Sequence, residues 1–191
     1  VDAIVSELEL FSKGQAAPAV LLEDHAVQGG GVAFVYAGNG AQWLGMGRRL
    51  LTESVRFSAI MGSLAALVAR RADFSIIAEL QSTPELSRLH DTAIAQPLLF
   101  AMQVALTTML RESGIEPLAV TGHSVGEVAA AWAVGALSLN QAVEVICTRS
   151  AAQARTGGTG RMAAVGLSAQ AAAEWLADGY PDIEVAGVNS P

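Results

Sequence analysis

The sequence predicts an α/β fold in which a parallel sheet is covered by helices. Short apolar segments typical of buried strands alternate with longer segments of helical periodicity. One apolar segment runs directly into a sharp glycine-containing turn and then a helix, at residues 118–134. The composition is that of a folded protein, since 52% of the residues are hydrophobic and only 15% are charged.

The first part of the chain leads to a single predicted strand. Apolar positions at helical spacing predict a short helix over residues 1–12, and the Pro, Ala and Gly content of residues 14–31 is typical of a linker. Residues 31–37, GVAFVYA, are apolar throughout, as expected for a strand covered on both faces. A glycine-rich loop follows at 38–47.

The middle of the chain is predicted to be mostly helical. Helical periodicity predicts helices from about Arg48 and over residues 54–71, 73–80, 93–111, 124–134 and 140–155. A polar break at 81–91 interrupts this run, and a second strand is expected at 118–123. A parallel sheet with helical crossovers follows from this order.

The last part of the chain predicts a separate β-α-β unit. The glycine-rich stretch RTGGTG, residues 155–160, is expected to be a hinge. A strand at 161–166, a helix at 168–178 and a strand at 183–188 follow it. Two strands and one helix make a poor domain on their own, so we expect further residues to complete this lobe.

Charge and composition exclude several classes of protein. The net charge of −7 and the absence of a basic cluster argue against nucleic-acid binding. The acidic N-terminus does not resemble a signal peptide, and we expect no apolar run of about 18 residues to span a membrane. The expected location is therefore the cytoplasm. Cys147, the one cysteine, is expected to be buried, and nothing indicates a metal site.

The segment GHSVGE, residues 122–127, is typical of a nucleophile elbow in a hydrolase-like core. The two glycines allow the strand and helix to approach closely, and the turn exposes the hydroxyl of Ser124. The helix N-terminus offers the backbone N–H of Val125 to an oxyanion. Ser124 and Glu127 also match a capping box, although the preceding strand and both glycines favour a nucleophile.

A base for Ser124 is missing from the sequence. An α/β-hydrolase places its acid and its histidine after the serine, whereas His25, His90 and His123 all precede Ser124. His123 is expected to point to the opposite face from its neighbour, and His90 lies in a polar segment. A self-sufficient hydrolase is therefore disfavoured.

Several motifs together resemble the malonyl-CoA:acyl-carrier-protein transacylase family, in particular the acyltransferase domains of polyketide synthases. They are FVYAGNGAQWLGMG, AQPLLFAMQ, GHSVGEVAAAWAVGALSL, RS at 149–150, GRMAAVG and GVNSP. The resemblance implies three regions. Residues 1–30 would end a ketosynthase–acyltransferase linker, 31–157 would form the large α/β subdomain, and 158–191 would begin a small ferredoxin-like subdomain whose C-terminal remainder is absent.

The resemblance also implies catalytic roles. Ser124 would attack the thioester of malonyl-CoA, form an acyl-serine ester and pass the acyl group to the phosphopantetheine thiol of an acyl carrier protein. The backbone N–H groups of Val125 and Asn39 would form the oxyanion hole. Asn39 stands where the family usually has Gln, a change that a backbone donor tolerates. The family's catalytic histidine would follow Pro191, so the fragment is expected to have little activity alone.

Four residues would bind substrate or support the site. Arg149 would hold the free carboxylate of a malonyl-type group through a bidentate pair. Gln96 would line the acyl pocket, and His123 would also belong to the substrate-binding residues. Asn189 would support the catalytic histidine. The aliphatic residue after Ser124 and the segment DTAIAQPLLFA favour malonyl over methylmalonyl.

The resemblance implies no bound cofactor. The expected partners are an acyl-CoA, an acyl carrier protein, the neighbouring ketosynthase and the C-terminal remainder of the domain. Two other functions stay open: a non-catalytic module that docks a carrier protein or scaffolds a synthase, and a serine hydrolase or thioesterase.

Overall fold

The computed structural model describes Leu10, Lys13 and residues 31–177 and 179–188. The expected helix over 1–12 and linker over 14–31 lie almost entirely outside the described residues, as do His25 and Asn189.

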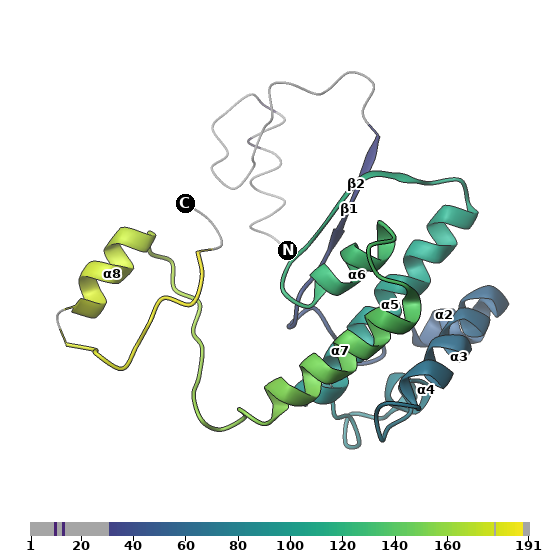
Figure 1. Ribbon diagram of the computed structural model, residues 1–191, viewed down its shortest axis with the longest axis horizontal. Coiled ribbons are helices and arrows are strands. Elements are labelled where there is room, and N and C mark those ends of the chain that lie inside the picture. Colours follow the sequence, from purple (N-terminus) through teal and green to yellow (C-terminus); the bar gives the residue numbers. More distant parts are fainter. Residues whose placement is uncertain (1–9, 11–12, 14–30, 178, 189–191) are drawn as a thin grey trace.

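Two parallel strands lie side by side at the centre of the fold (Figure 1). They are β1 (Val32–Tyr36) and β2 (Pro117–Gly122), which confirms both strands predicted for this part of the chain. Tyr36 is in register with Gly122, so both strands end at the same edge of the sheet. The loops that follow them therefore meet at that edge, which is where α/β proteins place their sites.

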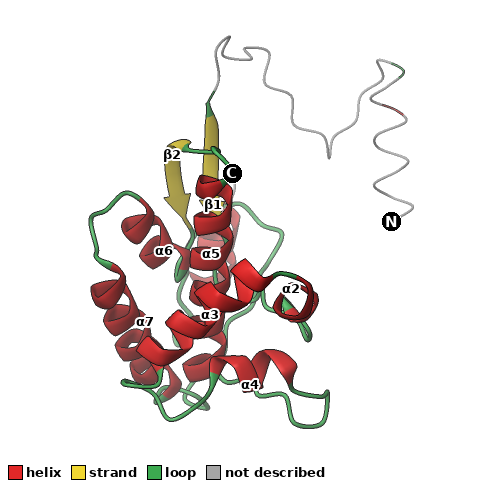
Figure 2. Cartoon of the chain, turned by 90° about the vertical axis from the view of Figure 1, so that its right-hand side faces the viewer, coloured by secondary structure: helices red, strands yellow, loops and turns green. Residues whose placement is uncertain are grey.

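The helices lie to one side of the strands, and Figure 2 shows the strands above the main group of helices. The helices are α2 (Arg48–Glu53), α3 (Val55–Val68), α4 (Ile76–Gln81), α5 (Thr92–Glu112), α6 (Gly126–Ala133), α7 (Leu139–Ala154) and α8 (Ala169–Ala177). Polar side chains cap the start of five of them. The residues that accept a backbone N–H from the first turn are Ser54, Ser75, Asp91, Ser138 and Ser168.

Helix α5 is the core of the structure and packs against α3, α4, α6 and α7. Leu98, Phe100 and Ala101 are fully buried along it. The hydroxyls of Tyr36 and Thr107 form a buried 2.9 Å hydrogen bond that ties α5 to β1. By length and composition α5 could cross a membrane, contrary to our expectation that no such run exists. The protein buries 61% of its apolar window, which assigns α5 to the core.

The expectation that β1 is covered on both faces is wrong. Phe34 and Tyr36 are buried, whereas Val35 between them is 74% exposed. Helix α6 packs against both strands. Since the buried residues of β1 alternate with exposed ones, the helices cover one face of the strand.

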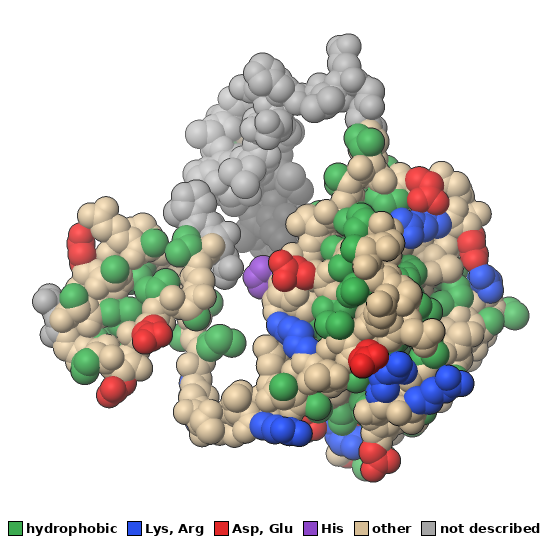
Figure 3. Space-filling view, viewed as in Figure 1, with side chains coloured by type: hydrophobic (Ala, Val, Ile, Leu, Met, Phe, Trp, Pro, Cys, Tyr) green, Lys and Arg blue, Asp and Glu red, His purple; other side chains and the backbone are tan. Residues whose placement is uncertain are grey.

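The predicted β-α-β unit is only partly present. Helix α8 is confirmed, but residues 161–166 and 183–188 form no strand. A strand requires a neighbour for its backbone N–H and C=O groups, and neither segment pairs with another among the described residues. The unit lies apart from the main body in Figure 1, and hydrophobic side chains are spread over its surface in Figure 3. Met162, for example, is 93% exposed.

Candidate active site

Ser124 occupies a strained backbone conformation at the turn between β2 and α6. Its φ is 53°, and no other non-glycine residue in the described part of the chain has a positive φ. This left-handed conformation costs an L-residue roughly 1–2 kcal/mol. The side chain is exposed. A strained, exposed serine between a strand and a helix has the geometry of a nucleophile elbow.

Two glycines make this turn sterically possible. A Cβ at Gly122 would lie 2.3 Å from the backbone carbonyl atoms of Gly126. A Cβ at Gly126 would lie 2.2 Å from the carbonyl oxygen of Tyr36, in the neighbouring strand. The start of α6 therefore packs directly on the ends of both strands, as the sequence predicts.

The alternative role of Ser124, a helix cap, is wrong. The N-cap of α6 is Val125, and no side chain caps this helix. Backbone groups close the turn instead: the N–H of Gly126 donates to the carbonyl of His123 at 2.9 Å, and that of Glu127 to the carbonyl of Ser124 at 3.1 Å. The hydroxyl of Ser124 is thus left for another partner. The Val125 side chain is fully buried, so its backbone is the part that can face the site.

The partner of the hydroxyl is Arg149, from α7. Its Nη2 donates to Ser124 Oγ at 3.2 Å. Its Nη1 donates to Gln96 Oε1, from α5, and to Gln153 Oε1, one turn further along α7, at 3.2 Å. The Nε2 of Gln96 donates to Gln153 Oε1 at 2.6 Å. The structure therefore brings together three predicted residues, Ser124, Arg149 and Gln96, although they lie far apart in the sequence.

Gln153 is the member of this group that the sequence analysis missed. It lies four residues after Arg149, and residues at this spacing are neighbours on a helix surface. That spacing was the available signal. It is a weak signal, because most exposed helical glutamines contact only solvent.

The loop after β1 lies against the serine turn. A Cβ at Gly38 would lie 2.6 Å from His123 Nδ1 and 3.3 Å from Ser124 Cβ. Asn39 follows directly and is exposed. The predicted pair of loops, one carrying Asn39 and the other His123 and Ser124, is therefore adjacent in the structure.

Two further glutamines that the sequence analysis missed hold this loop. Gln103 Nε2, on α5, donates to the carbonyl of Ala37 at 2.7 Å. Gln42 Oε1 accepts the N–H of Gly40 at 2.8 Å, and its Nε2 donates to the carbonyl of Leu89 at 3.2 Å. Side chains thus fix the backbone on both sides of Asn39.

Neither histidine in the described residues provides a base for Ser124. His90 is exposed between α4 and α5, and the imidazole of His123 lies beside Gly38. No hydrogen bond joins either ring to Ser124 Oγ within the described part of the chain. Cys147 is buried as expected, and burial raises the pKa of its thiol, partly offset by Arg71. It therefore stays a thiol near neutral pH and is no competing nucleophile.

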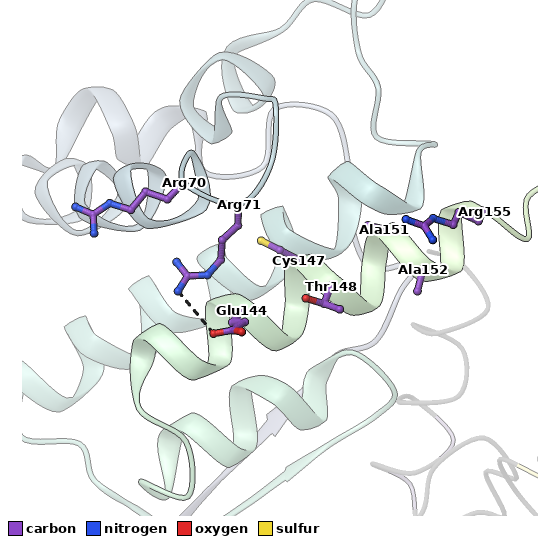
Figure 4. Close-up of a pocket in the computed structure, with 8 residues that line it drawn as sticks. All are labelled: Arg70, Arg71, Glu144, Cys147, Thr148, Ala151, Ala152 and Arg155. Carbon is purple, nitrogen blue, oxygen red and sulfur yellow. Dashed lines mark ion pairs between the residues drawn. The ribbon is translucent and has the colours of Figure 1, made fainter.

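One cavity lies away from Ser124, on another face of α7. Its lining residues are Arg70, Arg71, Glu144, Cys147, Thr148, Ala151, Ala152 and Arg155. In Figure 4 Arg71 points toward Glu144, Arg70 points away, and Arg155 lies at the far end of the row. These charges do not converge on one ligand, so the candidate site is the group around Ser124.

Comparison with known proteins identifies relatives of this chain. The acyl transferase domain family matches residues 33–191. The pikromycin polyketide synthase component PikAII of Streptomyces venezuelae is 41% identical over 92% of this chain, and the mycocerosic acid synthase-like polyketide synthase of Mycobacterium tuberculosis is 44% identical over 84%. The chain spans only 5% and 8% of the lengths of these relatives.

Comparison with solved structures identifies similar folds. The acyltransferase domain of the polyketide synthase PpsC of Mycobacterium tuberculosis has a TM-score of 0.70 and 38% identity, covering 92% of this chain and 50% of that one. The protein named MCAT from Streptococcus pneumoniae has a TM-score of 0.54 and 32% identity, covering 63% and 38%.

Proposed function

The chain belongs to the acyl transferase domain family, and from this premise we propose that it forms part of a polyketide synthase acyltransferase. It would move a malonyl-type group from CoA, through an ester on Ser124, to the phosphopantetheine thiol of an acyl carrier protein. The observation that carries the proposal is the hydrogen bond between Arg149 and Ser124. It supports the proposal because a guanidinium, which would pair with a carboxylate, lies beside a serine with a strained backbone.

The proposed reaction has two transfers. Ser124 Oγ loses its proton and attacks the thioester carbonyl, the bond to sulfur breaks, and CoA leaves as the thiol. The pantetheine thiol then attacks the ester, and the serine hydroxyl is restored. The proton acceptor would be the histidine that the family resemblance places after Pro191, supported by Asn189.

Two backbone N–H groups would stabilise the oxyanion formed in each transfer. Val125 is the N-cap of α6, where the helix dipole favours negative charge. The loop of Asn39 packs against Ser124 through Gly38. Donors held rigidly before the reaction contribute most to catalysis, and the contacts of Gln42 and Gln103 support that role for this loop.

Substrate selection would rest on Arg149. The carboxylate of a malonyl group would pair with the guanidinium and displace its contact with Ser124. Gln96 would border the acyl group, and His123 would contact the substrate from the turn. We propose malonyl over methylmalonyl.

The remaining proposals concern context. Residues 1–30 would end a ketosynthase–acyltransferase linker, 31–157 would be the large hydrolase-like subdomain, and 158–191 the start of a ferredoxin-like one. The expected partners are an acyl carrier protein, the neighbouring ketosynthase and the remainder of the domain. No bound cofactor, nucleic acid or membrane is proposed, and the proposed location is the cytoplasm.

Mass spectrometry of the acyl-enzyme tests the function. The protein joined to its C-terminal remainder is incubated with malonyl-CoA, and we expect a malonyl adduct on Ser124 that Ser124→Ala abolishes. The absence of any adduct would favour a docking or scaffold module. Rapid release of malonate to water without transfer to a carrier protein would favour a thioesterase.

The role of Arg149 is tested separately with Arg149→Ala. Loss of one charge-assisted pair is expected to slow acylation by malonyl-CoA by about 10- to 100-fold. Acylation by acetyl-CoA, which has no free carboxylate, should change little. Equal losses for both substrates in stopped-flow acylation assays would argue against carboxylate recognition.

A further inference from the structure

We propose that Gln153 is a positioning residue that aims the guanidinium of Arg149 at the acyl group and thereby favours carboxylated substrates. This inference rests on the proposed function.

The hydrogen bonds around Gln153 form a closed group. Its Oε1 accepts from Arg149 Nη1 at 3.2 Å and from Gln96 Nε2 at 2.6 Å. Arg149 Nη1 also donates to Gln96 Oε1. The Nη1 side of the guanidinium is thus held by two amide oxygens, while Nη2 points to Ser124.

Holding one side of the guanidinium fixes the direction of the other. A free arginine side chain loses rotamer entropy when it binds a carboxylate, and a planar guanidinium that is already anchored loses less of it. Gln153 supplies such an anchor from the same helix. Gln96 supplies a second anchor from α5 and is 1% exposed.

The neutrality of the anchors also matters. An amide oxygen accepts a hydrogen bond without cancelling the charge of Arg149, whereas a carboxylate at the same position would form an ion pair with it. The positive charge therefore remains available to a substrate carboxylate. Glutamine, and not glutamate, is the residue that suits this position.

The exposure of Gln153 makes the idea testable without unfolding the protein. Gln153 is exposed on α7, so its own side chain is not part of the core. Gln153→Met removes the acceptor of the buried Gln96 Nε2, whereas Gln153→Glu keeps an acceptor oxygen there, and the pair of variants therefore separates the two effects. Gln96 is buried, and its substitution would mix folding with function. Met and Glu both have good helix propensity and nearly the length of Gln.

The experiment compares Gln153→Met and Gln153→Glu in the complete acyltransferase domain. Acylation of Ser124 is followed by stopped flow with malonyl-CoA and acetyl-CoA, which gives KM and the rate constant for each. Gln153→Met removes the acceptor and is expected to raise KM for malonyl-CoA about 3- to 10-fold, with acetyl-CoA unchanged. Gln153→Glu keeps the acceptor but adds a charge, and its effect on malonyl-CoA should be larger than that of Met.

The control is Gln81→Met, the same chemical change at an exposed position at the end of α4. It should change neither substrate. Equal losses for malonyl-CoA and acetyl-CoA in the Gln153 variants would overturn the inference, because a general distortion would then be the cause. Unchanged kinetics for both substrates would overturn it as well. A wild-type domain that neither substrate acylates would instead refute the proposed function and the inference together.

Discussion

The serine turn and the C-terminal unit differ in how much tertiary packing supports the structure that the local sequence predicts. At the turn, β2, α6 and the end of β1 pack so closely that Gly122 and Gly126 admit no side chain. In residues 158–188, α8 forms, but the segments on either side of it stay exposed and without strand pairing. A helix satisfies its own backbone, whereas a strand depends on a neighbour. Tertiary packing therefore determines the backbone conformation of the serine turn. In the C-terminal unit, where strand pairing is missing, only the helix forms.

The largest expected difference between the two regions is their response to one added methyl group. Gly126→Ala would place a Cβ 2.2 Å from the carbonyl oxygen of Tyr36. Overpacking against backbone that cannot move aside should lower the free energy of unfolding by about 3 kcal/mol. Gly166→Ala, in the C-terminal unit, meets no heavy atom within 4 Å and should change it by less than about 0.5 kcal/mol.

Urea denaturation monitored by circular dichroism measures both variants. Similar stabilities for the two alanine variants would show that the close approach of α6 to β1 is not what holds the turn.

A smaller effect is expected from relieving strain at the serine. Ser124→Gly and Ser124→Ala both lose the hydroxyl and the hydrogen bond from Arg149, but only glycine adopts a φ of 53° without cost. The glycine variant should be more stable than the alanine variant by about 0.5–1 kcal/mol. The difference between their denaturation midpoints isolates the strain.

Neither of these variants should form an acyl adduct. An alanine variant as stable as the glycine variant would mean that the turn stores no strain.

The smallest effect concerns charge pairs at the surface. Arg56 on α3 pairs with Glu112 at the end of α5, and the hydrogen bond from Arg56 lowers the pKa of Glu112 below its ordinary value. A lowered pKa means that the stabilisation is present above the unfolded-state pKa and disappears as the pH falls through the lower, folded-state pKa. The free energy of unfolding of Glu112→Gln, measured by acid denaturation, should therefore lack the decrease that protonation of Glu112 causes in the wild type at low pH.

Glu174→Gln in α8 is the matched control, since Glu174 accepts a hydrogen bond from Gln170 within the same helix. A pair inside one helix links no distant elements, so this variant should denature like the wild type. Identical acid profiles for Glu112→Gln and the wild type would show that the pair between α3 and α5 adds nothing measurable.

The sequence predicted the helices and the serine turn because their signals are local. Polar caps such as Ser138 and the glycines beside Ser124 act within a few residues of where they stand. The two strand predictions at 161–166 and 183–188 failed because an apolar segment forms a strand only beside another strand, and neither has a partner strand among the described residues. The prediction that β1 is covered on both faces was wrong for a related reason. An apolar strand sequence does not show how many of its faces pack against other elements, and Val35 is exposed.

The site was predicted less completely than the fold. Ser124, Arg149 and Gln96 were recognised through motifs, and the structure brings them together. Gln153 was missed because it belongs to no motif and acts through a contact with Arg149. Gln42 and Gln103 lie inside two of the motifs, but the motifs do not reveal their roles, because both act through backbone atoms of the loop.

The hydrogen bond from Arg149 to Ser124 also fixes the path by which a proton can leave. A guanidinium has donors and no acceptor, so the hydroxyl hydrogen of Ser124 cannot point toward Arg149. It must point to another side of the oxygen. While this contact holds, before any substrate is bound, a base can accept the proton of Ser124 only from a side of the oxygen that does not face Arg149.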